Sequence, residues 1–316
     1  MKKQKVSKDF YVDWHVVAPG IWRIKDIFVN IYLVHNPQDN TWVMIDAGLP
    51  SSAKKIIKVT RHLFWPESRP SGIILTHAHF DHTGSLQKLA EEWDVPVYAH
   101  SMERPYLTGI SAYPPPDPSV GGGLMSLLSF LFPRGPINIA NRFIPLPSDG
   151  TLPGLTGWKY YHTPGHAPGH ISLMRQSDRV LIAGDAVVTT NQESAVAVML
   201  QSPSLQGPPK YFTYNWMSSE RSAKIIAALE PSILATGHGK PMEGTAMRKA
   251  LHQLADHFSE LAVPDSGRYV NQPALVNQDG VQYIPPSATT KLILTAAAIA
   301  ASAVLGYFFI QRSRKP

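Results

Sequence analysis

Four side chains that commonly bind metal ions fall within six residues of this chain, in the stretch I-I-L-T-H-A-H-F-D-H-T-G from Ile73 to Gly84. They are His77, His79, Asp81 and His82, and they directly follow an apolar run that predicts a buried strand. Residues two apart on an extended segment point the same way, so His77 and His79 can hold one ion while Asp81 and His82 turn toward a second. The stretch therefore predicts metal-assisted chemistry.

Three later positions offer the remaining ligands of such a site. His166 lies in the Gly/Pro loop H-T-P-G-H-A-P-G-H, and Asp185 follows the apolar run V-L-I-A-G. His238 lies in A-T-G-H-G-K, with a glycine on each side. Each of the three is expected at the end of a strand, where a rigid turn can aim its side chain at a common point.

The elements that must position these residues follow from the periodicity of apolar residues. Strands are predicted at 27–34, 41–45, 73–75, 95–99, 158–161, 171–174, 180–182 and 233–234. Helices are predicted at 51–63, 84–93, 216–229 and 244–261. The mixture of strands and helices indicates an α+β protein with the candidate ligands at strand ends.

Residues 105–147 differ in composition from their surroundings, being rich in proline and containing the run Gly121-Gly122-Gly123. They predict an insertion or lid within the catalytic domain. The apolar segment 124–132 is compatible with a short buried helix or with a flap over a pocket or against lipid, and it is too short to span a bilayer.

The two ends of the chain carry their own signals. Residues 1–14 form a basic extension without the apolar run of a signal peptide, and 263–290 resemble a linker. Residues 292–310 are nineteen positions without a charge, which predicts a transmembrane helix at 291–311 followed by a basic tail at 312–316. The alternative is a helix packed on the domain. We therefore expect a single-pass membrane protein with a C-terminal anchor and a cytoplasmic catalytic domain, although the basic flank fits that orientation poorly.

Composition narrows the class of protein. The chain has 316 residues and 44% hydrophobic content, enough for a substantial core, and it has no cysteine. Thiolate zinc sites and cysteine nucleophiles are excluded, which leaves histidine and carboxylate as ligands. The net charge of +6 comes from the ends: eight of the 29 basic residues lie there, which leaves 21 against 23 acidic ones. A nucleic-acid partner is therefore not expected, and no feature indicates a protein partner.

The motifs H-x-H-x-D-H, T-P-G-H, G-D and G-H-G, in this order, resemble those of the metallo-β-lactamase superfamily over residues 15–262. The resemblance implies a four-layer αβ/βα sandwich with a two-metal site at one edge of its sheets. It also implies that His77, His79 and His166 hold one ion, that Asp81, His82 and His238 hold the other, and that Asp185 bridges both. His162 and His170 do not match ligand positions, and we expect them to support the site or the fold.

The resemblance implies a hydrolase in which a metal-bridging hydroxide attacks the substrate, with Asp81 as the candidate proton donor to the leaving group. The nitrogen and oxygen ligands suit two divalent ions, zinc first, with manganese or iron as alternatives. A metal-free binding protein on the same fold is the hypothesis of another class, and metal analysis distinguishes the two.

The substrate is inferred from departures from the family's patterns. An aspartate stands at position 185, where the commoner metal-dependent β-lactamases have cysteine, so the chain resembles glyoxalase II thioesterases and lactonases more closely. Lactonases usually have a tyrosine where this chain has Val188. We expect an ester, thioester or lactone of a small, hydrophobic or acyl-bearing molecule, with a phosphodiesterase or nuclease as the alternative. Tyr211 and Tyr214 are candidate substrate residues, and the alternative is that both are core aromatics.

Overall fold

A computed structural model describes residues 14–287, which contain a seven-stranded sheet, a five-stranded sheet and a two-stranded hairpin. The strands are β1 Trp14–Ala18, β2 Ile21–Asp26, β3 Val29–Asn36, β4 Thr41–Ile45, β5 Ile73–Ile74, β6 Val97–Ala99, β7 Phe143–Pro145, β8 Trp158–His162, β9 Ile171–Arg175, β10 Val180–Ile182, β11 Ile233–Ala235, β12 Met242–Glu243, β13 Leu275–Asn277 and β14 Gly280–Tyr283. The first seven strands form one sheet in sequence order, and the next five form the second in the order β12-β11-β10-β9-β8.

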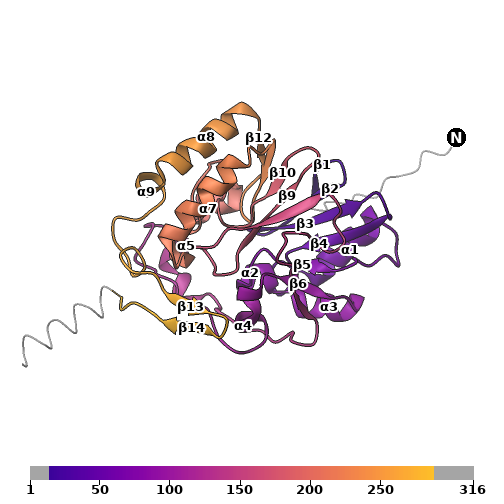
Figure 1. Cartoon of the computed structure of the whole chain (residues 1–316), viewed down its shortest axis with the longest axis horizontal. Coiled ribbons are helices and arrows are strands. Elements are labelled where there is room, and N and C mark those ends of the chain that lie inside the picture. Colours follow the sequence, from indigo (N-terminus) through magenta and orange to yellow (C-terminus); the bar gives the residue numbers. More distant parts are fainter. Residues whose placement is uncertain (1–13, 288–316) are drawn as a thin grey trace, which may run out of the picture.

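The helices lie outside the two sheets, and Figure 1 shows α1 and α3 on one side of the molecule and α7 and α8 on the other. The α-helices are α1 Ala53–Leu63, α2 Phe80–Thr83, α3 Leu86–Trp93, α4 Arg104–Leu107, α5 Leu124–Leu127, α6 Ala195–Leu200, α7 Trp216–Ala228, α8 Gly244–Asp256 and α9 Phe258–Leu261. Three short 3₁₀ turns complete the set, namely η1 Ser101–Glu103, η2 Ser129–Leu131 and η3 Lys210–Phe212.

Alternation along the central strands explains the layers. On β3, Tyr32 and Val34 pack into an apolar cluster that contains residues of both sheets and of no helix. Their neighbours Ile31 and Leu33 belong to the cluster that includes the buried faces of the helices. Because successive side chains of a strand point to opposite faces, one strand supplies both interfaces. The expected four-layer αβ/βα arrangement is therefore confirmed for the described residues.

The parallel strands fix where the loops meet. β4 pairs in parallel with β5, and β5 with β6, while β10 pairs in parallel with β11 in the other sheet. The carboxyl ends of β5, β10 and β11 carry the segments with His77, Asp185 and His238. The backbone N–H of Asn30 donates to the carbonyl of Gly237 at 2.8 Å, which ties the two sheets together at this edge.

The proline-rich segment 105–147 is only partly an insertion outside the core. Tyr106, Tyr113 and Ile139 are buried in the main apolar cluster, and β7 extends the seven-stranded sheet. Within it, the apolar run splits into α5 and η2, where Leu127, Phe130 and their neighbours are exposed. The prediction of a short buried helix is therefore wrong for this run.

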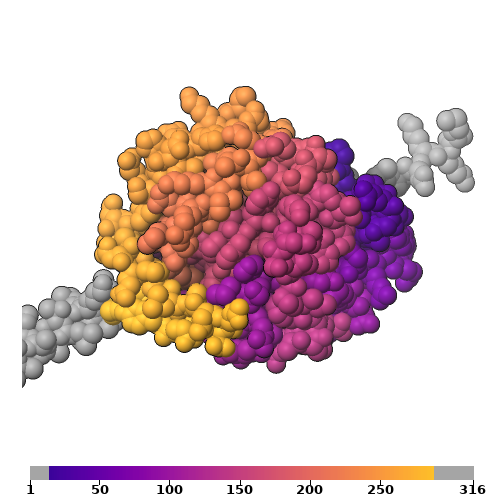
Figure 2. All heavy atoms as spheres, viewed as in Figure 1, coloured from indigo at the N-terminus to yellow at the C-terminus, as the bar shows by residue number. Residues whose placement is uncertain are grey.

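The segment after residue 262, predicted to be a linker, is folded as far as it is described. It contains the β13–β14 hairpin, and Tyr269 is buried with its hydroxyl donating to the carbonyl of Pro115 at 2.5 Å. The backbone N–H of Arg268 donates to Asp117 at 2.5 Å. In Figure 2 this part of the chain, in yellow, lies flush against the body of the molecule. Residues 263–287 are thus part of the domain.

The prediction of a membrane-spanning fold is corrected by the same structure. No helix within residues 14–287 is long and apolar enough to cross a membrane. The longest of them, α7 and α8, have 13 residues each, whereas a span needs about 20. The predicted span 291–311 and tail 312–316, like most of the basic extension 1–14, lie outside the described residues. The transmembrane fold class and the membrane localisation drawn from that span are therefore not supported.

Candidate metal centre

The histidine stretch changes conformation between its first and second pair of ligands. Thr76 is fixed after β5 because its backbone N–H and its hydroxyl both donate to Asp46, each at 2.8 Å. His79 has extended backbone angles, and α2 begins at the next residue. His77 and His79 therefore lie on extended chain, while Asp81 and His82 lie on the first turn of a helix, as the sequence predicts.

One group of three nitrogen atoms is formed by His77, His79 and His166. The Nε2 atom of His77 lies 3.0 Å from Nδ1 of His79, which lies 2.9 Å from Nε2 of His166. Burial lowers the pKa of His166 to about 3 and the pKa of His77 and His79 well below the usual value, and neighbouring histidines lower the latter two further. The rings are thus neutral at neutral pH, which is the form that binds metal ions.

A second group is formed by Asp81, His82 and His238, whose ligand atoms lie within 4.8 Å of one another. Burial alone would lower the pKa of His82, but the carboxylates of Asp46, Asp185 and Asp81 raise it well above its usual value. A metal ion bound here would replace the proton on that ring.

Asp185 lies between the two groups. Its Oδ2 is 3.5 Å from Nε2 of His166, in the first group, and 3.0 Å from Nε2 of His238, in the second. Burial would raise the pKa of this carboxyl, but His238 and His82 lower it well below its usual range. One carboxylate therefore faces the ligand atoms of both groups, which is the arrangement expected of a bridging ligand.

The donor set fits metal ions, as two observations on protein atoms show. Nε2 of His82 and Oδ1 of Asp185 are buried and have no hydrogen-bond partner among the described residues. A Cβ on Gly237 would lie 2.0 Å from that Oδ1 and 2.8 Å from Cε1 of His82, so only glycine leaves the space in front of them open. Five histidines and two aspartates offer nitrogen and oxygen donors of the kind that divalent ions such as zinc accept.

Several groups that are not ligands themselves orient the ligands through hydrogen bonds. Asp46 accepts from Nδ1 of His82 at 2.8 Å, and the carbonyl of Phe28 accepts from Nδ1 of His238 at 2.8 Å. His170 fixes the Asp185 backbone, since its Nε2 accepts from that N–H at 2.8 Å. Sequence patterns could not identify Asp46, whose partners lie 30 or more residues away.

His162, in contrast, lies away from the cluster. Its exposed ring stacks on His100 at 4.0 Å and bonds the carbonyl of Pro168. The two histidines that flank His166 therefore differ: His170 bonds the Asp185 backbone, whereas His162 contacts the loop that carries His166 only at Pro168.

Glu103 connects the two loops that carry the first group of ligands. Its carboxylate accepts from the backbone N–H of Ala78 at 2.9 Å, from that of Gly169 at 2.6 Å and from the hydroxyl of Tyr113. The Tyr113 ring also packs on His79, with centroids 4.4 Å apart. Glu103 is fully buried, and burial raises its pKa to about 7. In the sequence, the only sign of this role is that Glu103 is an acidic residue next to a segment rich in tyrosine and proline.

The two candidate tyrosines take different positions. Tyr211 lines the small cavity above the cluster, together with Asp81 and Phe212. Tyr214 is buried, and its hydroxyl lies 3.4 Å from Nε2 of His79, on the side of that ring away from the Nδ1 that faces the cluster. Tyr214 therefore contacts a ligand, and its role as a substrate residue is no longer favoured; Tyr211 remains a prediction.

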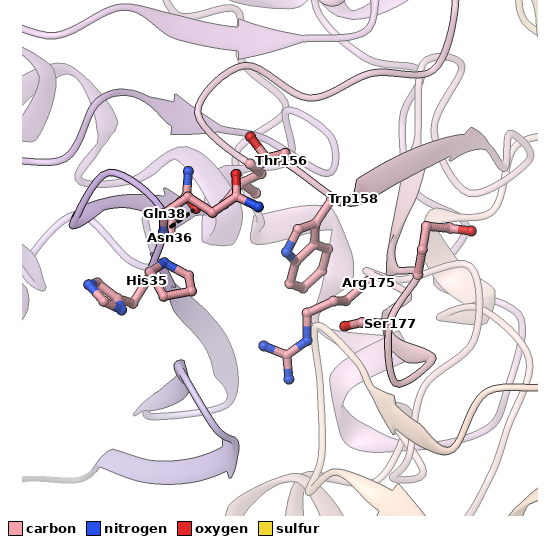
Figure 3. A pocket seen from close by; sticks show the side chains of 11 residues that line it. His35, Asn36, Gln38, Thr156, Trp158, Arg175 and Ser177 are labelled. Carbon is pink, nitrogen blue, oxygen red and sulfur yellow. Dashed lines mark hydrogen bonds between the residues drawn. The ribbon is translucent and has the colours of Figure 1, made fainter.

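A larger cavity, of about 510 Å³, lies at the opposite edge of the sheets (Figure 3). Its lining includes His35 at the end of β3, Trp158 at the start of β8 and Arg175 at the end of β9. Arg175 is already held by Asp178 at 2.7 Å and by the carbonyl of Pro19 at 2.7 Å. No group of metal-binding side chains faces this cavity within the part of the chain that the structure describes, so the chemistry belongs to the histidine cluster.

Comparison with known proteins agrees with this geometry. The sequence model of the metallo-β-lactamase superfamily matches residues 24–238. YflN of Bacillus subtilis (strain 168), described as a probable metallo-hydrolase, is 44% identical over 245 residues, 77% of this chain and 93% of that protein. YybB of the same strain, also described as a probable metallo-hydrolase, is 28% identical over 197 residues, 62% of this chain and 75% of that protein.

Solved structures show the same fold. A B3 metallo-β-lactamase with an active-site glutamic acid superposes with a TM-score of 0.53 at 19% identity, over 78% of this chain and 88% of that one. The relatives and the cluster together support a hydrolase that uses divalent metal ions. The chain belongs to the metallo-β-lactamase superfamily.

Proposed function

We propose that the protein is a dinuclear metallo-hydrolase that cleaves an ester, thioester or lactone bond in a small apolar or acyl-bearing substrate. His77, His79 and His166 would hold one ion and Asp81, His82 and His238 the other, with zinc preferred over manganese or iron. The observation that carries the proposal is the position of Asp185, whose Oδ2 lies within 3.5 Å of a ligand nitrogen of each group.

Two divalent ions bound at such a centre lower the pKa of a water molecule and polarise a carbonyl oxygen. In the net reaction, water adds to the carbonyl carbon, the C–O or C–S bond breaks, and an acid and an alcohol or thiol leave. Asp81 faces the cavity and is the residue that we propose as proton donor to the leaving oxygen or sulfur. Asp46, Glu103 and His170 hold the ligand loops in place for this step.

The preference for an acyl substrate rests on the cavity wall and on Val188. Beside the ligands, the wall is formed mainly by apolar and aromatic side chains: Phe28, Phe80, Met125, Phe132, Pro209, Tyr211 and Phe212. Val188, which is buried and pairs through its backbone with Gln206, has an aliphatic side chain without a hydroxyl for a lactone carbonyl. An ester or thioester is therefore favoured over a lactone.

Metal analysis and a substrate panel test the proposal on the purified full chain. We expect about two divalent ions per chain and hydrolysis of acyl thioesters or esters that a chelator abolishes and added zinc or manganese restores. Cleavage of bis-p-nitrophenyl phosphate alone would favour the phosphodiesterase alternative. A protein that binds no metal and shows no hydrolysis with added metal would instead be a binding protein on this fold.

A further inference from the structure

The cavity at the metal centre is closed to any substrate of the proposed class. Its volume is about 10 Å³, roughly the space of one water molecule. Met125 and Phe132 close it from outside, and both belong to residues 121–134, here called the lid segment. An ester or thioester can reach the ligands only if the lid segment moves.

Glycines at both ends of the lid segment permit such a movement. Gly121 and Gly122 have φ angles of +77° and +68° at one end, and Gly135 has +72° just beyond the other. These left-handed conformations are open to glycine and strained for most other residues. Between the ends, the backbone N–H of Met125 donates to the carbonyl of Glu193 at 3.1 Å, and Phe132 stacks on Phe80 with centroids 5.5 Å apart.

In the closed lid segment, polar side chains are buried and apolar side chains are exposed, the reverse of the usual distribution. Ser126 and Ser129 are fully buried, and their hydroxyls have no hydrogen-bond partner among the described residues. The apolar side chains point outward instead, with 37–65% exposure at Leu124, Leu127, Leu128, Phe130 and Leu131. Buried unpaired hydroxyls and exposed leucines both disfavour this arrangement in water, so the closed state is poorly stabilised by the lid's own side chains.

A second apolar surface lies beside the lid. α6 follows Glu193 directly, and its Val196, Met199 and Leu200 are 66–73% exposed. Ile27, 63% exposed, lies near it, since the ammonium group of Lys25 donates to the carbonyl of Met199 at 3.4 Å. Exposed apolar residues from separate parts of the chain thus lie next to segments that close the cavity, since Ile27 precedes Phe28 of the cavity wall and α6 begins two residues after Glu193, which bonds Met125.

We propose that residues 121–134 are a lid that opens when the acyl chain of a substrate binds between the lid and α6, with Phe80 and Phe212 as its floor. The acyl chain would cover apolar protein surface that is exposed to water in the closed state, and this burial would offset the free-energy cost of opening the lid. The occupant is the acyl chain of a single dissolved substrate molecule, because the carbonyl at the end of that chain must reach the metal ligands. The inference rests on the proposed ester or thioester hydrolysis for its substrate class.

A chain-length series tests the acyl site on the metal-loaded full chain. Acetyl, hexanoyl and decanoyl thioesters of one small thiol are compared below the concentrations at which they form micelles. We expect kcat/KM to rise by about tenfold or more from acetyl to decanoyl, because each buried methylene favours binding. Equal values along the series would overturn the acyl site while leaving the proposed hydrolase intact.

Two glycines provide a matched pair for the lid. A Cβ at Gly123 would lie 1.9 Å from the carbonyl oxygen of Glu193, whereas a Cβ at Gly157, which lines the cavity at the opposite edge of the sheets, would meet nothing within 4 Å. We expect Gly123→Ala to loosen the lid, raising acetyl thioester turnover and reducing the decanoyl preference several-fold. Gly157→Ala, which adds backbone strain at a φ of +78° outside the lid segment, should keep the preference of the wild type. The same behaviour in both variants would contradict the lid.

A fluorescent label gives a readout that needs no hydrolysis. The chain has no cysteine, so Leu128→Cys can be labelled alone with a polarity-sensitive dye. We expect decanoate, the product of the longest substrate, to shift the emission, and acetate at the same concentration not to. Ile144→Cys on β7, 45% exposed and outside both the lid segment and the cavity lining, is the control and should respond to neither.

The two readouts separate the two proposals. A dye response in a protein that hydrolyses no thioester, ester or lactone supports the lid and contradicts the proposed function. Hydrolysis without a dye response, or an equal response to acetate, contradicts the lid alone.

Discussion

At the scale of single residues, the chemistry depends on one carboxylate that faces two groups of ligands. Asp185 lies at the end of β10, and His170 holds its backbone while Gly237 leaves its Oδ1 uncovered. The ligands themselves were recognisable in the sequence because four of them are adjacent and the others follow strands. Asp46 and Glu103 were not recognisable, because a carboxylate that supports a loop looks like any other until its distant partners are known.

His166 and His162 are a matched pair four residues apart. Changing His166 to Ala removes a nitrogen that lies 2.9 Å from Nδ1 of His79, so we expect the loss of about one of two bound ions and a fall in hydrolysis of about 100-fold or more. His162→Ala removes a ring that stacks on His100 and bonds the carbonyl of Pro168, outside the cluster, and should leave the metal content unchanged because every ligand remains. Elemental analysis of the two purified variants measures this, and full metal content in His166→Ala would refute the ligand assignment.

Glu103 is expected to act as a positioning residue. In Glu103→Gln the side-chain amide keeps the size but cannot accept from all three donors, Ala78, Gly169 and Tyr113. The two ligand loops should lose their common anchor, and metal affinity should fall by about 10–100-fold. Competition with a chelator measures the affinity. Glu260→Gln, at an exposed carboxylate that forms an ion pair with His257 at 3.6 Å, is the control and should bind metal like the wild type.

At the scale of elements, the strands and helices around the site were largely predictable. β3, β4, β8 and β9 and the helices α1, α3, α7 and α8 lie within a few residues of their predicted ranges, because each has clear apolar periodicity. β1 and β2 were missed. β2 carries the buried charge Arg23, which donates to the carbonyl of Gly239 at 2.9 Å, 216 residues away, so the sequence of β2 does not alternate as that of an isolated strand would.

The segment 263–287 gives the prediction that belongs to this scale. Tyr269 is 3% exposed, packs edge-on against Tyr214 at 5.4 Å and bonds Pro115. We expect Tyr269→Ala to lower the free energy of unfolding by about 3–5 kcal/mol, as for other buried aromatic residues. Tyr283→Ala, at a position 39% exposed on β14, should cost less than about 1 kcal/mol. Urea denaturation of both variants decides, and equal small losses would mean that the segment is a linker after all.

For the whole molecule, the packing of the two sheets brings ligands from the first and second halves of the chain to one edge. The first five strands and the first helices deliver His77 to His82, and the second sheet delivers Asp185 and His238. The four-layer fold was predictable only through the resemblance of the motifs, since periodicity reveals strands and not how they pair. The folded state of 263–287 could not be predicted, because its polar composition resembles a linker and its contacts are to residues near 115.

The metal-free protein should show a stability that depends on pH in a way set by its buried histidines. Burial holds the pKa of His77, His79, His166 and His170 below the ordinary value of 6.5. Below pH 6.5 these rings are protonated in the unfolded chain but not in the folded one, so stability falls as the pH is lowered.

His82 and His238 have raised pKa values and act in the opposite direction, because carboxylates outweigh the effect of burial there. Their contribution is complete below pH 6.5 and is lost as the pH rises through their folded pKa. Burial also raises the pKa of Asp81 and raises that of Glu103 to about 7, and these two carboxyls oppose the four histidines because their contribution is lost as the pH rises through the same range. Because four histidines act against two carboxyls, the metal-free protein should be most stable near pH 6.5 and lose stability on both sides. Denaturation midpoints measured from pH 5 to 9 in the presence of a chelator test this, with the Tyr283→Ala variant, which removes no histidine, as a control that keeps the maximum. Added zinc should raise stability most at the alkaline end, where protons no longer compete for the ligands. A metal-free protein whose stability climbs steadily to pH 9 would contradict the assignment of raised pKa values to His82 and His238.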